Sequence, residues 1–360
     1  MPVYKDKKNG TYYVRFHYYN WKNEIKYVTK RGFKKKTEAS AYEAEYKKKL
    51  SGSSNMRLAD FVDIYLNSIS SRVKESTLET KKSIIYQHIV PSLGEKRLED
   101  ITKIDIISWQ NELLQYVNSN TNKGYTKSYL KTLHNQLSAL LNYAVKYYNL
   151  DRNYAAVVGN MGTDKEVKIN FWTLDQYKKF SEEMMNIPEY YYAFETLYWS
   201  GIREGELLAL TLSDIDFENS TISVNKTFSV IKGREVITSP KTRKSVRVVK
   251  IPSFLCDELK DYVEMLYQPE ENQRLFPVTK GSLVRMIHSG AKRAGVPEIR
   301  VHDLRHSHVS LLINMGFSAV DIADRVGHES VHITYHYSHM FPNVQGKITN
   351  ALDNAKKGGD

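Results

Sequence analysis

The sequence S-G-I-R-E-G-E-L-L-A-L (200–210) places Arg203 two residues after Gly201 and three residues before Glu206. A helix can begin just after the glycine, and this spacing puts Glu206 on the same helical face as Arg203, where its carboxylate can orient the guanidinium. A guanidinium stays protonated, and its planar fork can donate two hydrogen bonds to one phosphate. Taken alone, the pattern is also typical of a structural salt bridge.

Further stretches extend the pattern towards the C-terminus. V-H-D-L-R-H contains His302 and Arg305, whose spacing lets both side chains face one way from a helix and bracket one phosphate. V-G-H-E-S contains His328, 23 residues after Arg305, and Y-H-Y-S-H follows with two tyrosines. H-x-x-R alone is common by chance, but the fixed spacing to Gly-His and then to tyrosine makes the set specific. It predicts a phosphoryl-transfer site without a carboxylate cluster suited to a metal.

The order and local sequence of these motifs resemble the catalytic domain of the tyrosine recombinases, the phage-integrase family. The resemblance implies that DNA is cut through a covalent phosphotyrosine, with no metal or nucleotide cofactor. It implies a multidomain, mainly helical fold with small β-sheets and a mixed α/β, mostly helical catalytic domain. The implied catalytic residues are Arg203 and Arg305 (phosphate clamp), His302 (general acid/base or hydrogen-bond donor), His328 (bond to the scissile phosphate), Lys241 and Tyr337.

Lys241 lies in S-P-K-T-R-K, between the runs 234–238 and 245–251, which have the pattern of two strands. A lysine on such a flexible hairpin can reach a leaving 5′ oxygen and deliver a proton as it departs. The resemblance assigns this role to the lysine of P-K-T, and Arg243 and Lys244 are expected to contact the DNA backbone.

Two tyrosines compete for the role of nucleophile. The family places its tyrosine directly before a Ser/Thr-His pair, about nine residues after the histidine of Gly-His, and both criteria select Tyr337 over Tyr335. A phenol has a pKa near 10 and must lose its proton as it attacks, so the positive charge of the site would assist. His306 and His308, next to the second arginine, are expected to be structural.

Composition excludes several other classes of protein. The 360 residues contain one cysteine, Cys256, which excludes an intramolecular disulfide and a cysteine-based zinc cluster. The sequence lacks an apolar stretch of the roughly 18 residues that a membrane span needs, and the N-terminus lacks the apolar core of a signal peptide. We expect a cytoplasmic, nucleoid-associated protein of a bacterial cell. The net charge of +11 indicates a polyanionic partner.

Most of this charge lies in the first fifty residues, where 14 Lys/Arg face 5 Asp/Glu, a net charge of +9. Residues 10–33 predict two strands joined by a turn at N-W-K-N-E, and the helix that follows can be capped by Thr37. Residues 1–52 resemble an arm-type DNA-binding domain, whose sheet can enter a major groove. The alternatives are a solvated basic tail or a generic ββ(β)α module. The expected DNA contacts are Arg15, Lys22, Lys26 and Lys30.

Residues 57–155 predict a bundle of four amphipathic helices, similar to a core-binding domain. Its first helix has apolar residues at helical spacing, Ser76 or Thr77 can cap the second, and Pro91 is expected to end that helix. The apolar residues of the first helix are Leu58, Phe61, Val62, Tyr65 and Leu66. The candidate phosphate contacts are Lys81, Lys82, Lys127 and Lys131, each of which is also typical of a plain solvent-facing lysine.

Residues 168–342 are expected to form the catalytic domain, with Thr173 as the N-cap of its first helix, and residues 343–360 to form a tail that docks on a neighbouring protomer. The predicted function is a site-specific recombinase that integrates and excises a mobile element. Its expected partners are core and arm-type attachment sites in double-stranded DNA and three further copies of the chain, which exchange strands through a Holliday junction. An excisionase or a host DNA-bending protein is a further candidate partner.

Two other functions use the same residues or fold. A tyrosine-type DNA topoisomerase would act on one duplex without synapsis, and the separate basic N-terminal segment favours the recombinase. A non-catalytic DNA-binding protein of the same fold is disfavoured because all six implied catalytic residues are present.

Overall fold

The computed structural model describes residues 3–6, 9–19, 25–50, 54–162, 169–240 and 243–331, with Thr334, Tyr337, Thr349 and Lys356. The chain divides into two compact units, Met1–Val167 and Lys168–Asp360. The first unit contains both segments that the sequence separates, 1–52 and 57–155. The structure is mainly helical with small antiparallel sheets, as expected. Within the described residues, no helix is both long and apolar enough to cross a membrane.

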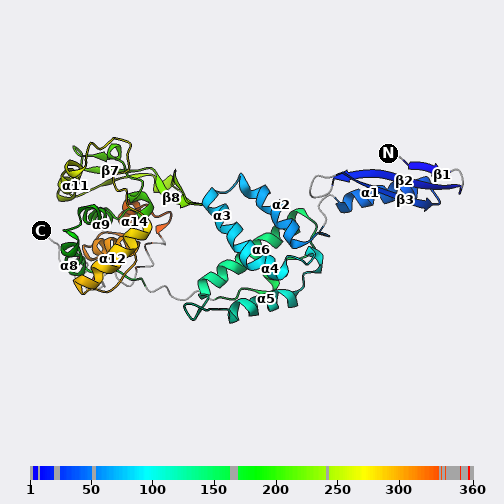
Figure 1. The fold of residues 1–360 in the computed structure, drawn as a ribbon, viewed down its shortest axis with the longest axis horizontal. Helices are drawn as coiled ribbons and strands as arrows, with labels where there is room; N and C mark the ends of the chain where they lie inside the picture. The colour runs from blue at the N-terminus through cyan, green and yellow to red at the C-terminus, as the bar shows by residue number, and fades with distance from the viewer. Residues whose placement is uncertain are drawn as a thin grey trace. The chain divides into compact units, whose positions relative to one another are not determined.

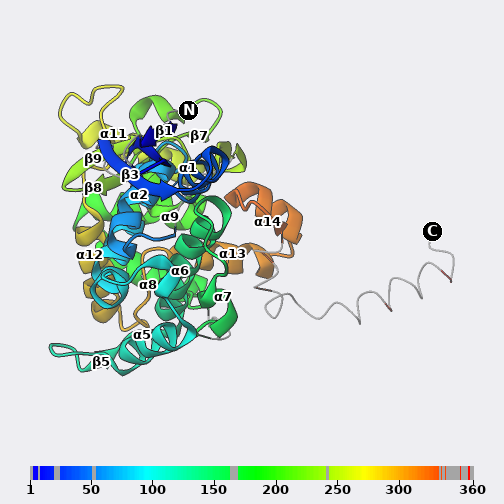
Figure 2. The same cartoon turned by 90° about the vertical axis from the view of Figure 1, so that its right-hand side faces the viewer.

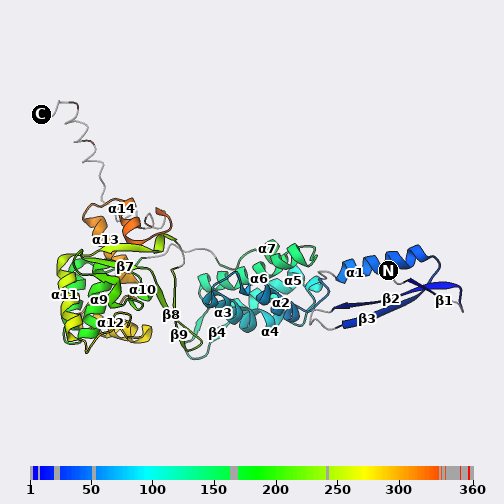
Figure 3. The ribbon, with the colours of Figure 1, turned by 90° about the horizontal axis from the view of Figure 1, so that it is seen from above.

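The N-terminal segment is a three-stranded antiparallel sheet in the order β1-β2-β3, with one helix along one face (Figures 1 and 3). Val14 and Phe16 alternate towards this helix and are buried against Ala39. The predicted pairing of the two long strands is confirmed, and the expected turn at 20–24 lies outside the described residues. The elements are β1 (Val3–Asp6), β2 (Thr11–Tyr19), β3 (Ile25–Phe33) and α1 (Lys36–Leu50).

The helical part of the first unit has its own core. The predicted apolar residues of its first helix are all buried. Trp109 is also buried, and its ring N–H donates a 2.6 Å hydrogen bond to the carbonyl of His88. The strands β4 and β5 form a small hairpin that projects beyond α5 (Figure 2). The elements are α2 (Leu58–Ser70), α3 (Glu75–Ile84), a π-helix (Ile85–Ile89), α4 (Val90–Leu93), a 3₁₀ turn (Leu98–Asp100), α5 (Lys103–Gln115), β4 (Val117–Asn118), β5 (Lys123–Gly124), α6 (Lys127–Tyr147) and α7 (Tyr154–Val158).

The expected helix ends need correction in this unit. The N-terminal helix α1 begins at Lys36, so Thr37 lies inside its first turn. The helix α3 has Lys74 as its N-cap, so Ser76 and Thr77 also lie inside the helix. Pro91 does not end the helical run. The preceding turn widens into a π-helix, and Pro91 occupies the first turn of α4, where a missing N–H breaks no helical hydrogen bond.

The second unit is mostly helical, with two small sheets. Thr173 caps α8 as predicted, in a capping box with Gln176. One sheet has the order β10-β7-β6, and the other pairs β8 with β9. The elements are α8 (Leu174–Met184), α9 (Pro188–Ser200), α10 (Glu204–Leu207), a 3₁₀ turn (Leu212–Asp214), β6 (Ile215–Asp216), β7 (Thr221–Val224), β8 (Thr227–Ile231), β9 (Arg234–Thr238), a 3₁₀ turn (Arg243–Ser245), β10 (Arg247–Lys250), α11 (Ser253–Met265), α12 (Lys280–Ala294), α13 (Asp303–Asn314) and α14 (Ala319–Val326).

The strands on either side of Lys241 exist, but the expectation that they form one hairpin is wrong. The strand β9 pairs with β8, whereas β10 pairs with β7 in the other sheet. The segment between β9 and β10 therefore connects two sheets. Lys241 itself lies outside the described residues.

Close packing of α12 on α8 depends on Gly290. A Cβ at this position would lie 2.6 Å from Cε2 of Phe180 and 2.9 Å from Sδ of Met184. Both neighbours are fully buried in the core, so the ring cannot swing into solvent. The glycine thus sets how closely the two helices approach.

We expect Gly290→Ala to lower the free energy of unfolding by about 1–3 kcal/mol, the usual cost of overpacking a core. The matched control is Gly281→Ala in the same helix, where a Cβ meets nothing closer than 3.8 Å. That variant should be neutral or slightly stabilising because alanine is the better helix former. Denaturant unfolding of the two variants measures the difference, and equal stabilities would contradict the clash.

Candidate active site

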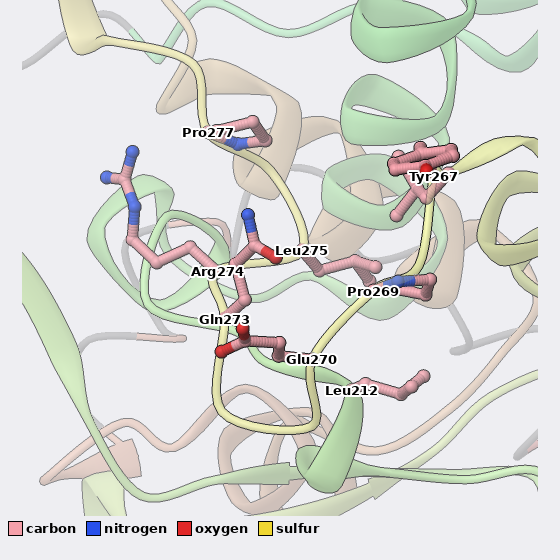
Figure 4. A pocket seen from close by; sticks show the side chains of 9 residues that line it. Leu212, Tyr267, Pro269, Glu270, Gln273, Arg274, Leu275 and Pro277 are labelled. Atoms are coloured by element: carbon pink, nitrogen blue, oxygen red, sulfur yellow. The ribbon is translucent and has the colours of Figure 1, made fainter.

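A surface pocket of the second unit lies beside the segment between α11 and α12, where Tyr267, Glu270 and Arg274 line it (Figure 4). The described residues that the motifs predict to be catalytic do not line this pocket. The site that the motifs predict lies elsewhere, where Arg305 bonds the carbonyl of Gly201, two residues before Arg203.

Arg203 is positioned by a tight break between two helices. The helix α9 ends at Gly201, which has a left-handed φ of +68°, and Arg203 is the N-cap of α10. A Cβ at Gly201 would lie 2.5 Å from Cδ2 of His308, so both the backbone angle and the packing require glycine. The turn brings the arginine out of the core immediately after the buried Ile202.

Glu206 holds two arginines at once. Its Oε1 accepts a 2.8 Å hydrogen bond from Nη1 of Arg203, and its Oε2 accepts a 3.0 Å bond from Nη2 of Arg247. The second terminal nitrogen of Arg203 donates to the carbonyl of Gly327 at 3.0 Å. Burial opposes the ionisation of Glu206, but the hydrogen bonds and charges of Arg247 and Arg203 outweigh it and lower its pKa. The predicted Arg203–Glu206 contact is present.

Arg305 is buried in α13 with an exposed fraction of 4%. Its Nη1 donates a 2.8 Å hydrogen bond to the carbonyl of Gly201, whereas its buried Nη2 has no hydrogen-bond partner among the described residues. Burial, together with the charges of Arg203 and Arg247, lowers its pKa to about 9. The guanidinium still carries its charge at neutral pH, so one of its donors is left for an anion.

His302 and His328 are both neutral at pH 7. His302 is the N-cap of α13, and desolvation, with His306 and Arg305 nearby, lowers its pKa to about 4. His328 follows α14 and is buried, and its Nδ1 is hydrogen-bonded to the hydroxyl of Thr334 at 2.9 Å. Burial and the nearby arginines lower its pKa to about 3. Neutral imidazoles can donate to a phosphate oxygen without adding charge.

Tyr337 is 3% exposed and packs against apolar residues of α13 and α14. Burial raises its pKa to about 12, although the charge of Arg305 acts in the opposite direction. The expected assistance from positive charge is thus smaller than the effect of burial. The tyrosine hydroxyl is hydrogen-bonded to Nδ1 of His306. The competing Tyr335 lies outside the described residues.

Sequence reasoning missed two residues of the site. Arg247 lies on β10, and its strand gives no signal that it will meet Glu206, 41 residues earlier. His306 was expected to be structural, but it contacts the hydroxyl of Tyr337. Its position directly after Arg305, on the same turn of α13, was the signal available. For His308 the structural expectation fits, since its buried ring accepts a hydrogen bond from Nε of Arg325.

The predicted DNA contacts of the helical segment differ in how they are held. Lys81 donates a 2.8 Å hydrogen bond to Gln136, and burial lowers its pKa. Lys82 pairs with Glu79 at 3.1 Å. Lys127 is exposed and Lys131 half-buried, one turn apart on α6. In the second unit Lys244 is exposed, and the side chain of Arg243 lies outside the described residues.

The N-terminal sheet has a basic, aromatic open face opposite α1. Arg15 is exposed there, with its guanidinium 6.0 Å from the ring centre of Tyr27. Lys30 is exposed but pairs with Val14, whose side chain faces α1. Because residues paired across two strands point to the same face of a sheet, Lys30 lies on the α1 face and not on the open face. Arg31, which the sequence reasoning missed, lies over Tyr13 at 5.2 Å. The expected contacts Lys22 and the side chain of Lys26 lie outside the described residues.

Three family descriptions match the chain in sequence order. Residues 2–50 match an arm DNA-binding domain, residues 57–114 a phage integrase N-terminal SAM-like domain, and residues 170–343 the phage integrase family. Over 310 residues the chain is 31% identical to the ICEBs1 integrase of Bacillus subtilis (strain 168), covering 81% of each protein. It is 25% identical to the integrase of Staphylococcus phage L54a over 79% of this chain and 88% of that protein.

Solved structures share the fold at lower sequence identity. The Tn1549 transposon integrase in complex with transposon right end DNA matches with a TM-score of 0.61 and 20% identity, over 84% of this chain and 100% of that chain. A lambda integrase tetramer bound to a Holliday junction matches with a TM-score of 0.58 and 19% identity, over 95% of both chains. The chain belongs to the phage integrase family and is a site-specific tyrosine recombinase of the kind that mobile genetic elements encode.

Proposed function

We propose that Tyr337 is the nucleophile of this recombinase and that Arg203 and Arg305 hold the phosphate it attacks. The observation that carries the proposal is the buried Nη2 of Arg305, which has no hydrogen-bond partner among the described residues. Leaving a donor of a charged group unpaired in the interior costs about 1–3 kcal/mol or more. A phosphate oxygen supplies the missing acceptor and the missing negative charge.

The charge balance around this point supports the same assignment. Burial lowers the pKa of Arg305, and the charges of Arg203 and Arg247 lower it further. Glu206 supplies one negative charge and is engaged by two of the three. An excess of buried positive charge that the described residues do not neutralise favours binding of an anion, and it stabilises the charge that develops on a phosphate under attack.

The chemistry then proceeds by transfer of one phosphoryl group. The Tyr337 oxygen forms a bond to the scissile phosphorus while the bond from phosphorus to the 5′ oxygen breaks, which leaves a 3′-phosphotyrosine and a 5′-hydroxyl. Lys241 is proposed to protonate the leaving 5′ oxygen. His302 and His328 are proposed to donate hydrogen bonds to the non-bridging oxygens. The 5′-hydroxyl of the partner strand then attacks the phosphotyrosine and reseals the backbone, so the bond energy is conserved without ATP.

We propose that residues 1–52 bind arm-type sites, that residues 57–155 and 168–342 each bind core-site DNA, and that residues 343–360 dock on a neighbouring protomer in a tetramer. Lambda integrase, a protein of this fold, forms a tetramer on a Holliday junction. The match of residues 2–50 to an arm DNA-binding domain favours recombination between separate sites over relaxation of a single duplex. An excisionase or a host DNA-bending protein is proposed as a further partner.

Covalent trapping tests the nucleophile. We expect wild-type protein, incubated in EDTA with a pool of nicked duplexes, to give an adduct that denaturing electrophoresis detects and peptide mass spectrometry places on Tyr337. Tyr337→Phe should give no adduct because it lacks the attacking oxygen, while it still binds DNA. An adduct on Tyr335 would correct the assignment, and none on specifically bound DNA would refute the recombinase chemistry.

We expect Arg305→Lys to slow cleavage by about 10²- to 10³-fold, the usual cost of removing one donor to a developing charge. A lysine ammonium cannot bond the carbonyl of Gly201 and a phosphate in the two directions that the guanidinium spans. Single-turnover cleavage at saturating protein measures the loss. The control is Arg293→Lys, a partly exposed arginine of α12 that pairs with Glu183 at 3.3 Å. Equal rates for the two variants would remove Arg305 from the site.

Glu206→Gln should lower the free energy of unfolding by about 3–5 kcal/mol, because it leaves the buried Arg247 without its carboxylate. The folded-state pKa of Glu206 is lowered, so its contribution is present above the unfolded pKa and is lost as pH falls through the folded one. The stability difference between wild type and variant, measured by denaturant unfolding, should therefore shrink below about pH 4. A difference that does not change with pH would exclude this electrostatic account.

A further inference from the structure

His306 joins the hydroxyl of the proposed nucleophile to a buried carboxylate. On one side its Nδ1 is hydrogen-bonded to the hydroxyl of Tyr337. On the other side its Nε2 lies 3.8 Å from Oδ1 of Asp303, one turn earlier in α13. The ring is only partly buried, whereas Asp303 has no exposed surface. A histidine between a hydroxyl nucleophile and a carboxylate is the arrangement that other enzymes use to activate a hydroxyl.

We propose that His306 is the general base that takes the proton of Tyr337 as the tyrosine attacks the scissile phosphate. The inference rests on the proposed role of Tyr337 as nucleophile. In this scheme His306 removes the proton from the attacking Tyr337 oxygen, and Lys241 protonates the leaving 5′ oxygen. The two proton transfers of the reaction are therefore made by different residues.

The step balances in both directions. As the bond from the Tyr337 oxygen to phosphorus forms, the phenolic proton passes to Nδ1 of His306, and the departing 5′ oxygen receives a proton from Lys241. In the resealing step the 5′-hydroxyl gives up its proton to Lys241, and His306 returns its proton to the leaving tyrosine oxygen. Each residue therefore ends the cycle in the state in which it began.

The protonation states suit this exchange. Burial raises the pKa of Tyr337 to about 12, so the hydroxyl keeps its proton at neutral pH and needs an acceptor. Burial lowers the pKa of His306, and the charges of Arg300 and Arg305 act in the same direction, against the opposite effect of Asp303. The ring of His302 also faces it, at 5.1 Å between ring centres. His306 is thus neutral at pH 7 and can accept a proton.

The charge of Asp303 favours the tautomer that the role requires. A ring that accepts at Nδ1 carries its hydrogen on Nε2, the nitrogen nearer to Asp303. Arg300 holds this carboxylate through a backbone hydrogen bond of 2.9 Å and a side-chain bond of 2.7 Å. At 3.8 Å the carboxylate acts on the ring through its charge, which offsets the positive charge that His306 gains when it takes the proton.

The test compares His306→Asn, His306→Gln and His306→Ala with wild type in single-turnover cleavage of the half-site recovered by covalent trapping. The asparagine oxygen can accept the tyrosine hydrogen bond near the former Nδ1, but it cannot take up the proton. We expect His306→Asn to slow cleavage by about 10²- to 10⁴-fold with DNA affinity unchanged. Its rate should rise about tenfold per pH unit above neutrality, as the phenol ionises unaided. His288→Ala, an exposed histidine of α12, should match wild type.

A second substrate separates the two proton transfers. When sulfur replaces the bridging 5′ oxygen, the thiolate leaves without a proton, so the defect of Lys241→Ala should disappear while that of His306→Asn persists. The assignment of His306 as the base would be overturned if the sulfur substrate restored the cleavage rate of His306→Asn. It would also be overturned if His306→Asn cleaved the oxygen substrate at the wild-type rate. If His306→Ala loses DNA binding, the cleavage rates of the asparagine and glutamine variants are the ones that test the assignment. Wild-type protein that forms no adduct would refute the proposed function and not this inference alone.

Discussion

The geometry of the site depends on the hydrogen bonds that the carboxylate of Glu206 accepts from two arginines. It lies in the core with an exposed fraction of 3%, and it accepts hydrogen bonds from Arg203 on its own turn and from Arg247 on a distant strand. Removing a charged carboxylate from water is costly, and two guanidinium groups together offset that cost. The same contact joins α10 to β10, so Arg203, which is proposed to hold the phosphate, is positioned by both a helix and a sheet.

In the proposed mechanism a DNA phosphate completes this site. Arg203 uses its terminal nitrogens on Glu206 and on the carbonyl of Gly327, whereas Arg305 leaves one buried nitrogen without a partner among the described residues. The histidines nearby are neutral, so they add donors without increasing the repulsion between the arginines. In the proposed reaction a phosphate offsets the repulsion among these arginines, and charge preorganised in this way stabilises a transition state.

Contacts between residues close in the sequence could be predicted, whereas contacts that depend on the pairing of distant segments could not. The contact of Arg203 with Glu206 follows from a spacing of three residues, and the cap at Thr173 from its neighbours. The hairpin expected around Lys241 was wrong because strand pairing is chosen by the whole sheet, and β9 and β10 find different partners. Arg247 escaped notice for the same reason, since alternation on a strand does not reveal which residue lies opposite. The N-caps expected at Thr37 and at Ser76 or Thr77 lie two or three residues too far along the chain, close to the ordinary precision with which helix ends are assigned.

One helix supplies both the charge and the proton acceptor of the proposed reaction. Arg305 and His306 are adjacent in α13 but contact different parts of the site. Arg305 donates a hydrogen bond to the carbonyl of Gly201, between α9 and α10, whereas His306 is hydrogen-bonded to the hydroxyl of Tyr337. Asp303, three residues before His306, is fully buried and faces the same ring. Because both side chains lie on one helix, the proposed phosphate clamp and the proposed base are positioned by the same backbone. Tyr337 also packs against Val309 and Ile313 of this helix, so α13 positions the proposed nucleophile as well.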